Sequence, residues 1–471
     1  MTNLQTIVNS KKKSENFLHP FMPSLGIELA LQEGVPLNIG DVKLTKKLLA
    51  NNEESGYYKW GKTYPPDYDD TITALNMFNL LNEPKRKQLN FDFSRNGGIF
   101  TYKGGLESKS NNNVDLLINL RILDYLQNSE SDSESYLRLI EFLKREKNEF
   151  FKSVQQISKY YCSEGFLLYS LSKVSNLLDI NIDEIIDYKK DILNSEPDKQ
   201  LAFLASQSNK QLLNEMELFK ENDFYLFQHP RLGLKFKNNF LEKVITEATQ
   251  NKLNPSFNEW VSKIYDSNGR TLYSYKQDSD ALENLFEKYS INSKSTIVEL
   301  AVGTGNFLEK MITKYPKIIG IDTSEFMLEK AKEKLPKANL KNVKAQNLKI
   351  NADVIYSTNF IDLYGMEVQI WAKGFQESEE IINNIATQIN SNGYFFLHKK
   401  ENKKTLSFEL NIESAQEKNK IKTVYFYQDE KTIYRNEFEK VVYSFEDFNK
   451  KMITFGLKKI DENDNWIMYK R

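Results

Sequence analysis

The stretch that decides the fold of this chain reads Val298-Glu299-Leu300-Ala301-Val302-Gly303-Thr304-Gly305-Asn306-Phe307. A short apolar run leads into its two glycines, a helical pattern follows them, and a second apolar run ends seventeen positions after Gly305 in Asp322. This order is typical of a nucleotide-binding βαβ unit, in which glycines let the backbone approach the ligand and the acid binds ribose hydroxyls. Ala301 occupies the position of the first motif glycine, which argues against a pyrophosphate lying on the turn.

The run from Glu299 to Gly305 closely resembles motif I of the class I S-adenosylmethionine (SAM)-dependent methyltransferases. The resemblance implies an α/β Rossmann-like domain with SAM as its cofactor. Gly303 and Gly305 would then wrap the methionine moiety, and backbone amides at the start of the next helix would face its carboxylate. Glu299 resembles the family acid that orders this loop, and it would reach the ammonium group.

The remaining residues of the expected donor site carry open alternatives. Asp322 would accept both ribose hydroxyls, unless it caps the helix expected at 324–334. Met327 either flanks the adenine or belongs to the core. Gln346 or Asn347 stands where the family usually has an acid at the adenine amine. The complete expected set is Glu299, Ala301, Gly303, Thr304, Gly305, Asp322, Thr323, Met327, Gln346 and Asn347.

Residues 258–471 alternate helical patterns with short apolar runs, which predicts a doubly wound parallel sheet. Ser444 looks like the N-cap of the last helix and Gly456 like its end, and a terminal β-hairpin suits the methyltransferase variant of this fold. The expected strands cover 296–300, 318–322, 343–346, 354–357, 394–398, 423–428 and 466–469.

The chain after the fourth expected strand bears on the methyl acceptor. It reads Tyr356-Ser357-Thr358-Asn359-Phe360 and lacks the Asn/Asp-Pro-Pro-aromatic motif that DNA and protein-glutamine N-methyltransferases usually carry there. Holding acceptor and methyl group in line supplies much of the acceleration, and a base is needed only where the acceptor must lose a proton. His398 and Tyr265 are candidate bases. The alternative is that each is a half-buried polar residue at a strand end.

Residues 1–250 read almost entirely as helices. Helical patterns cover 71–81, 112–127, 133–151, 167–177, 182–194 and 200–219, without a strict internal repeat. Asn, Lys, Pro and Ser interrupt the pattern around 250–257, so we expect domains at 1–250 and 258–471.

The most distinctive run of the first half is Pro65-Pro66-Asp67-Tyr68-Asp69-Asp70-Thr71. It resembles the acid motif of class II terpene cyclases and squalene-hopene cyclases, which are built on α/α toroids. The resemblance implies an N-terminal all-α toroid with Asp69 as catalytic proton donor, while Asp67 and Asp70 raise its proton affinity. The same run is also a good helix N-cap with favourable charge at the helix start.

Two departures from full cyclases keep the role of this half open. It is long enough for one toroid rather than two, and it lacks the Gln/Trp repeats, since Trp60 is its only tryptophan before Trp260. An active cyclase, a toroid that binds an isoprenoid or another apolar substrate, and a structural helical domain therefore all remain possible readings.

Composition excludes several classes of function. The 64 Lys and Arg residues balance 65 Asp and Glu residues, which favours neither nucleic acid nor an acidic membrane surface as a partner. One cysteine among 471 residues excludes a disulfide framework, and with only three histidines it argues against a metal site. No membrane span or signal sequence is visible, so we expect a cytoplasmic protein, of open oligomeric state.

Together these features predict a SAM-dependent methyltransferase that acts on a small apolar or isoprenoid-derived molecule. In one hypothesis the toroid also cyclises that molecule, with Asp69 as general acid. In the alternatives the helical domain only binds the substrate, or it binds a partner protein.

Overall fold

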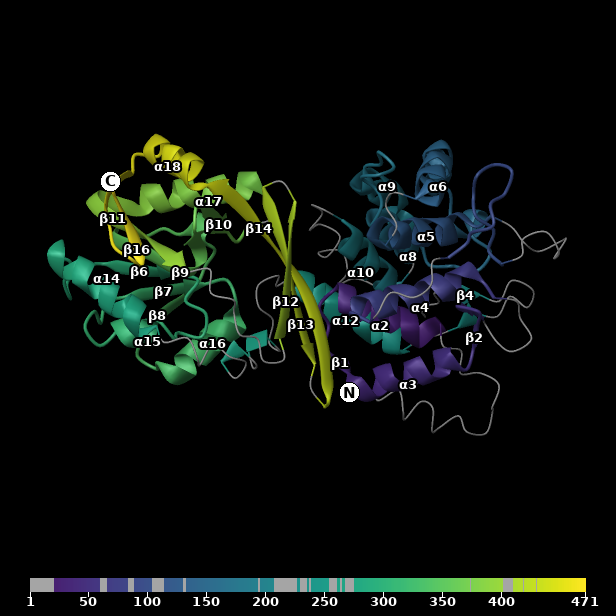
Figure 1. Cartoon of the computed structure of the whole chain (residues 1–471), viewed down its shortest axis with the longest axis horizontal. Coiled ribbons are helices and arrows are strands. Elements are labelled where there is room, and N and C mark those ends of the chain that lie inside the picture. Colours follow the sequence, from purple (N-terminus) through teal and green to yellow (C-terminus); the bar gives the residue numbers. More distant parts are fainter. Residues whose placement is uncertain are drawn as a thin grey trace. The chain divides into compact units, whose positions relative to one another are not determined.

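The chain divides into two compact units, Met1–Leu253 with Asp429–Arg435, and Asn254–Gln428 with Asn436–Arg471. We call them the helical unit and the sheet unit (Figure 1). Within the described residues, no helix is both long and apolar enough to cross a membrane. The computed structural model describes residues 21–59, 66–83, 89–103, 114–129, 133–193, 195–206, 227–228, 235–236, 239–253, 261–262, 265–266, 275–372, 374–400, 410–417, 419–428 and 430–471.

Capping residues and apolar faces account for the helices of the helical unit. Asp67, Ser133 and Ser163 each accept a hydrogen bond from a backbone amide in the first turn of the helix that follows. The main helices are α2 (Phe21–Gln32), α3 (Ile39–Ala50), α4 (Tyr68–Leu80), α5 (Leu116–Ser129), α6 (Glu134–Arg145), α8 (Glu164–Ser172), α9 (Ile182–Lys189), α10 (Glu196–Ala205) and α12 (Asn239–Leu253). Shorter pieces are η1 (Lys147–Phe151), α7 (Val154–Ile157) and η2 (Lys190–Ile192).

The core of the helical unit forms around helices that are buried nearly all round. Almost every side chain of α2 and of α8 is buried, as expected of central helices. α4 and α12 pack on α2, and α10 packs on α8. The prediction of an all-α first half agrees with these helices, whereas its toroid and cyclase character stays a prediction. Residues 207–219 of the last expected helix, and Pro65 of the acid motif, lie outside the described residues.

A few short strands complete the helical unit. β2 (Glu53–Glu54) pairs with β3 (Tyr57–Tyr58), and β4 (Phe227–Gln228) pairs with β5 (Lys235–Phe236). β1 (Leu37–Asn38) pairs with residues 432–433 of the returning chain, because the turn at 429–435 belongs to this unit. The sequence did not predict that this distant turn joins the first half.

The sheet unit is built on a sheet of strand order β8-β7-β6-β9-β11-β16-β15. The first five strands run parallel, and β16 is antiparallel to both of its neighbours. The order reverses between β6 and β9, which is the topological switch point where open α/β sheets bind ligands. The strands are β6 (Ile297–Leu300), β7 (Ile319–Asp322), β8 (Asn339–Asn342), β9 (Ala352–Tyr364), β11 (Ile389–Lys400), β15 (Lys458–Glu462) and β16 (Trp466–Lys470).

Helices cover both faces of this sheet, as the alternating pattern predicts. Along β6, Val298 and Leu300 pack with α17 (Phe375–Gln388) and α18 (Phe445–Thr454), whereas Ile297 packs on the opposite side with α14 (Lys276–Lys288) and α15 (Leu308–Met311). Leu328 of α16 (Glu325–Lys334) joins that second side. The expected caps of α18 are confirmed: Ser444 accepts from the amide of Asp447, and Gly456 follows the helix with φ +85°.

Two strand predictions need correction. The strand expected at 343–346 is wrong, because the third strand is β8 and residues Ala345–Asn347 form a 3-10 turn. β8 is a largely exposed edge strand, so it lacks the apolar run by which strands are recognised.

The second correction concerns length. β9 and β11 run well beyond the expected 354–357 and 394–398, and the end of β9 starts an antiparallel extension of the sheet that the sequence missed. This extension comprises β10 (Glu367–Ile370), β14 (Thr432–Ser444), β13 (Lys420–Gln428) and β12 (Leu410–Glu417).

Candidate active site at the carboxyl ends of β6 and β7

The glycine loop leaves β6 through three residues with left-handed backbone. Ala301, Gly303 and Gly305 have φ of +52°, +55° and +78°. A side chain at Gly303 would meet nothing within 4 Å, whereas a Cβ at Gly305 would lie 3.3 Å from Ala331 of α16. The two glycines therefore differ: Gly305 permits close helix packing, and Gly303 keeps open space beside the loop. Ala301 takes up a conformation that favours glycine, at a cost of about 1–2 kcal/mol.

Asp322 ends β7 and ties the glycine loop to the loop that follows it. Its Oδ2 accepts a 2.9 Å hydrogen bond from the amide of Gly303, and its Oδ1 accepts one of 2.9 Å from Ser324. Burial raises the pKa of Asp322, and these amide hydrogen bonds work against that rise. The N-cap of α16 is Ser324, which accepts from the amide of Met327, so the helix-cap alternative for Asp322 is wrong. Each carboxylate oxygen keeps a further lone pair for a ligand.

Glu299 is the second buried acid at this place. It lies on β6 opposite Tyr356 of β9, and the Tyr356 hydroxyl donates a 3.0 Å hydrogen bond to its Oε2. Burial raises the pKa of Glu299 to about 8, against the lowering effect of that hydrogen bond, and the charge of Asp322 adds to the rise. A cation bound beside these two acids would reverse this shift, because an opposite charge favours the carboxylate.

Asp266 contacts the glycine loop, and the sequence gave no signal for it beyond its neighbour Tyr265. Its Oδ1 accepts hydrogen bonds from the Thr304 hydroxyl at 2.6 Å and the Asn306 amide at 2.9 Å. Its Oδ2 lies 3.1 Å from Nζ of Lys334, which also donates to the Asn306 side chain. Burial works to raise the pKa of Asp266, but the hydrogen bonds from Thr304, Asn306 and Lys334 hold it below its usual value.

The other predicted donor-site residues are distributed unevenly. Thr304 and Met327 are buried, whereas Thr323 and Asn347 are exposed. Gln346 is half-buried and donates a 3.1 Å hydrogen bond to Oε1 of Glu377 on α17. The structure therefore brings Glu299, Gly303, Thr304 and Asp322 together at one edge of the sheet. It leaves the choice between Gln346 and Asn347, and between core and ligand for Met327, as predicted alternatives.

Comparison with known proteins adds a family to this geometry. Residues 291–446 match the family model described as "Methyltransferase domain". The C-terminal half contains a methyltransferase domain. An uncharacterized methyltransferase, YrrT of Halobacillus halophilus, is 34% identical over 82 residues, which are 17% of this chain and 38% of the relative. The chain thus spans less than half the length of this curated relative.

Solved structures with similar chains are methyltransferases or proteins of unstated activity. An S-adenosylmethionine-dependent methyltransferase from Clostridium acetobutylicum is 19% identical, with 44% of this chain and 95% of that chain covered at a TM-score of 0.32. The CcbJ methyltransferase from Streptomyces caelestis is 13% identical, with 44% and 95% covered at a TM-score of 0.35. The PH0226 protein from Pyrococcus horikoshii is 16% identical, with 46% and 99% covered at a TM-score of 0.35.

His398 of the methyltransferase domain lies between two carboxylates. Its Nε2 is 3.3 Å from Oδ2 of Asp278, and its Nδ1 is 3.7 Å from Oδ1 of Asp362, which also pairs with Lys400 at 3.2 Å. Burial would lower the pKa of His398, but the two carboxylates outweigh it and raise that pKa. A buried imidazolium is a poor base, so this setting argues against His398 as general base. Tyr265 is half-buried beside Asp266.

The three acids predicted in the helical unit are all buried at the start of α4. Asp67 is the N-cap and accepts a 2.7 Å hydrogen bond from the amide of Asp70. Asp69 accepts hydrogen bonds of 2.6 and 2.8 Å from the Tyr161 hydroxyl and lies 3.4 Å from Nε of Arg121. Burial raises the pKa of Asp69 to about 6, although Arg121 and Tyr161 lower it. Burial and mutual repulsion raise the pKa values of Asp67 and Asp70 further.

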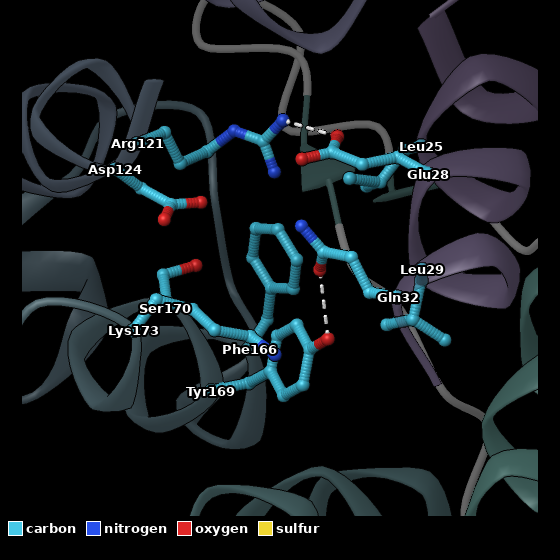
Figure 2. A pocket seen from close by; sticks show the side chains of 10 residues that line it. All are labelled: Leu25, Glu28, Leu29, Gln32, Arg121, Asp124, Phe166, Tyr169, Ser170 and Lys173. Atoms are coloured by element: carbon cyan, nitrogen blue, oxygen red, sulfur yellow. Dashed lines mark hydrogen bonds and ion pairs between the residues drawn. The ribbon is translucent and has the colours of Figure 1, made fainter. Parts of the chain in front are cut away.

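A pocket of the helical unit lies between α2, α5 and α8 (Figure 2). Arg121 of α5 and Glu28 of α2 form an ion pair of 2.9 Å on one side of it, and Tyr169 donates a 2.9 Å hydrogen bond to Gln32 on the other. Asp69 is not part of the lining, and the free volume is about 20 Å³, which suits a water molecule rather than an isoprenoid. The lining residues are Leu25, Glu28, Leu29, Gln32, Arg121, Asp124, Phe166, Tyr169, Ser170 and Lys173.

Proposed function

We propose that the chain is a SAM-dependent methyltransferase whose methyl donor binds at the carboxyl ends of β6 and β7. The observation that carries this proposal is the pairing of two buried acids, Glu299 and Asp322, on either side of a loop with open space at Gly303. This place is the switch point of the sheet, where ligands of open α/β folds bind. The match of residues 291–446 to a methyltransferase domain supports the same assignment.

The residues present fit the chemical groups of SAM. Asp322 has free lone pairs for the ribose hydroxyls, while its existing hydrogen bond holds the Gly303 amide in place. The carboxylate of Glu299 would pair with the donor's ammonium group. Open space at Gly303 lets the methionine part approach the backbone, and loop amides then face its carboxylate. The left-handed turn at Ala301 sets the direction in which the loop leaves β6.

The chemistry asks little more of the protein than orientation. The sulfonium supplies a good leaving group, and an acceptor held in line with the methyl group completes an in-line displacement. Well-oriented reactions of this kind gain up to roughly 7–11 kcal/mol from positioning alone. We propose a small apolar or isoprenoid-derived acceptor, because the region after Tyr356 lacks the motif of base-amine methyltransferases. The charged setting of His398 favours an acceptor that needs no base from this residue.

Titration calorimetry with SAM and S-adenosylhomocysteine tests the donor site. We expect wild-type chain to bind both, and Asp322→Ala to lose at least about tenfold in affinity, since two ribose contacts are removed. Glu325→Ala, an exposed acid in the first turn of α16, is the matched control and keeps normal affinity. A wild-type chain that binds neither compound would overturn the proposal.

Acid catalysis in the helical unit is the second candidate function. The observation that favours it is the burial of Asp67, Asp69 and Asp70 with raised pKa values, as expected of an acid kept neutral beside an apolar substrate. The ion pair of Asp69 with Arg121 favours the carboxylate instead, and supports the rival reading in which this unit only binds a substrate or a partner.

Product mass spectrometry separates these readings. The chain is incubated with SAM and a panel of linear prenyl diphosphates, beside Asp69→Asn and Asp322→Ala. A cyclised product lost only in Asp69→Asn, with a one-methyl gain lost only in Asp322→Ala, identifies a cyclase joined to a methyltransferase. Methylation that is unchanged in Asp69→Asn and never accompanied by cyclisation leaves a binding role for the helical unit.

A further inference from the structure

We propose that Asp266 is a positioning residue of the methyl donor site, which acts through the glycine loop on the amino-acid tail of the donor. This inference rests on the proposed function and names the group that keeps its donor site in shape. No motif marks Asp266 in the sequence, and its contacts appear only in the folded chain.

The contacts of Asp266 use both oxygens of its carboxylate. One oxygen accepts from the Thr304 hydroxyl at 2.6 Å and from the Asn306 side-chain amide at 2.9 Å. The other lies 3.1 Å from the ammonium group of Lys334, near the end of α16. Hydrogen bonds to an ionised acceptor are stronger than neutral ones, so these three partners form a tight cluster.

The cluster fixes the loop at the residues on either side of Gly305. Thr304 precedes Gly305 and Asn306 follows it, and the backbone of Gly305 itself lies against Ala331 of α16. Lys334 belongs to the same helix, so Asp266 ties the loop and the helix to one carboxylate. The loop cannot then shift without breaking several contacts at once.

The loop has two anchors that serve different parts of the donor. Asp322 holds the Gly303 amide and is proposed to face the ribose. Asp266 holds Thr304 and Asn306, in the part of the loop that leads into α15 and whose amides are proposed to face the methionine carboxylate. Removal of Asp266 should therefore weaken recognition of the amino-acid tail and spare recognition of the adenosine part.

Three ligands that share adenosine but differ in the tail test this division. SAM and S-adenosylhomocysteine carry the amino-acid tail, and 5′-methylthioadenosine lacks it. We expect Asp266→Ala to lose about tenfold in affinity for the first two and less than about twofold for the third, measured by calorimetry. Asp280→Ala, an exposed acid on α14, is the control and leaves all three affinities unchanged.

Asp266→Asn serves as a second variant should Asp266→Ala fail to fold. Its side-chain carbonyl still accepts from Thr304 and Asn306 but no longer pairs with the charge of Lys334, so we expect an intermediate loss, again confined to the ligands with a tail. Circular dichroism confirms that each variant is folded. Equal losses for all three ligands would reduce Asp266 to a general structural role and overturn the inference.

The controls also separate this inference from the proposed function. Normal SAM binding by wild type and unchanged binding by folded Asp266→Ala would overturn the inference alone. Absence of SAM binding in the wild-type chain would overturn the proposed function, and the inference with it.

Discussion

Glu299 and Tyr356 lie opposite each other on the parallel strands β6 and β9, and the Tyr356 hydroxyl donates a 3.0 Å hydrogen bond to Glu299 Oε2. The two strands flank the switch point of the sheet. Burial raises the pKa of Glu299 to about 8, so much of this carboxyl is neutral around neutral pH in the ligand-free protein. An ammonium group bound there would draw out the proton, which couples donor binding to pH.

SAM affinity should therefore rise with pH. Below the Glu299 pKa of about 8, the acid must release a proton before it pairs with the ammonium group. The affinity then gains at most about tenfold for each pH unit below that value. Calorimetry between about pH 6 and pH 7.5, below the Glu299 pKa of about 8, measures the slope. Glu299→Gln removes the titrating group and should give a flatter curve; an identical slope in both proteins would show that Glu299 does not bind the ammonium.

Tyr356→Phe should shift the same curve toward higher pH. The hydroxyl stabilises the ionised form of Glu299, so its loss raises the pKa of that acid further. A hydrogen bond of about 1 kcal/mol corresponds to roughly fivefold weaker SAM binding at neutral pH. Tyr443→Phe, which removes a buried hydroxyl bonded to Ser378 in the same unit, is the control. If both variants bind SAM like wild type, the Tyr356 contact has no part in the donor site.

Gly305→Ala should destabilise the protein more than Gly456→Ala. Both glycines have left-handed backbone, with φ of +78° and +85°, which costs alanine about 1–2 kcal/mol. A Cβ at Gly305 would also meet Ala331 and Leu335 at 3.3 Å, whereas one at Gly456 would meet nothing within 4 Å. Denaturant unfolding of the two variants gives the comparison. Equal losses of unfolding free energy would mean that α16 yields without cost.

Arg121→Met should strongly destabilise the helical unit. Arg121 pairs with Glu28 at 2.9 Å and with Asp69 at 3.4 Å, and all three side chains are buried. Breaking a buried pair by removing one partner costs about 3–5 kcal/mol, because a charge is left uncompensated. Lys144→Met on the surface of α6 is the control, and its exposed pair with Asp179 should matter little. Thermal unfolding that is unchanged in Arg121→Met would contradict this account.

A compensating variant checks the origin of that loss. Replacing Glu28 by Gln in the Arg121→Met background removes one of the stranded charges, so part of the lost stability should return. A double variant that is no more stable than Arg121→Met would mean that the arginine matters for packing alone.

The sequence predicted the parts of this protein that local pattern encodes. The apolar run, glycine turn and acid of Val298–Asp322 predicted β6, the loop and β7, because the residues needed for each lie within a few positions of one another. Asp67 and Ser444 were recognisable as caps for the same reason, since a cap bonds an amide three residues away.

Contacts between distant segments were beyond the sequence. Asp266 reaches Thr304 and Lys334 across long stretches of chain, and Arg121 joins Glu28 to Asp69 from three different helices. Likewise β8 was misplaced, because an exposed edge strand carries no apolar alternation. The sequence by itself determined the order of strands and helices and the acids of the donor site, since periodicity and turn chemistry are local. Only the tertiary structure decided which partners those acids have, because the pairing of buried charges depends on how whole elements pack.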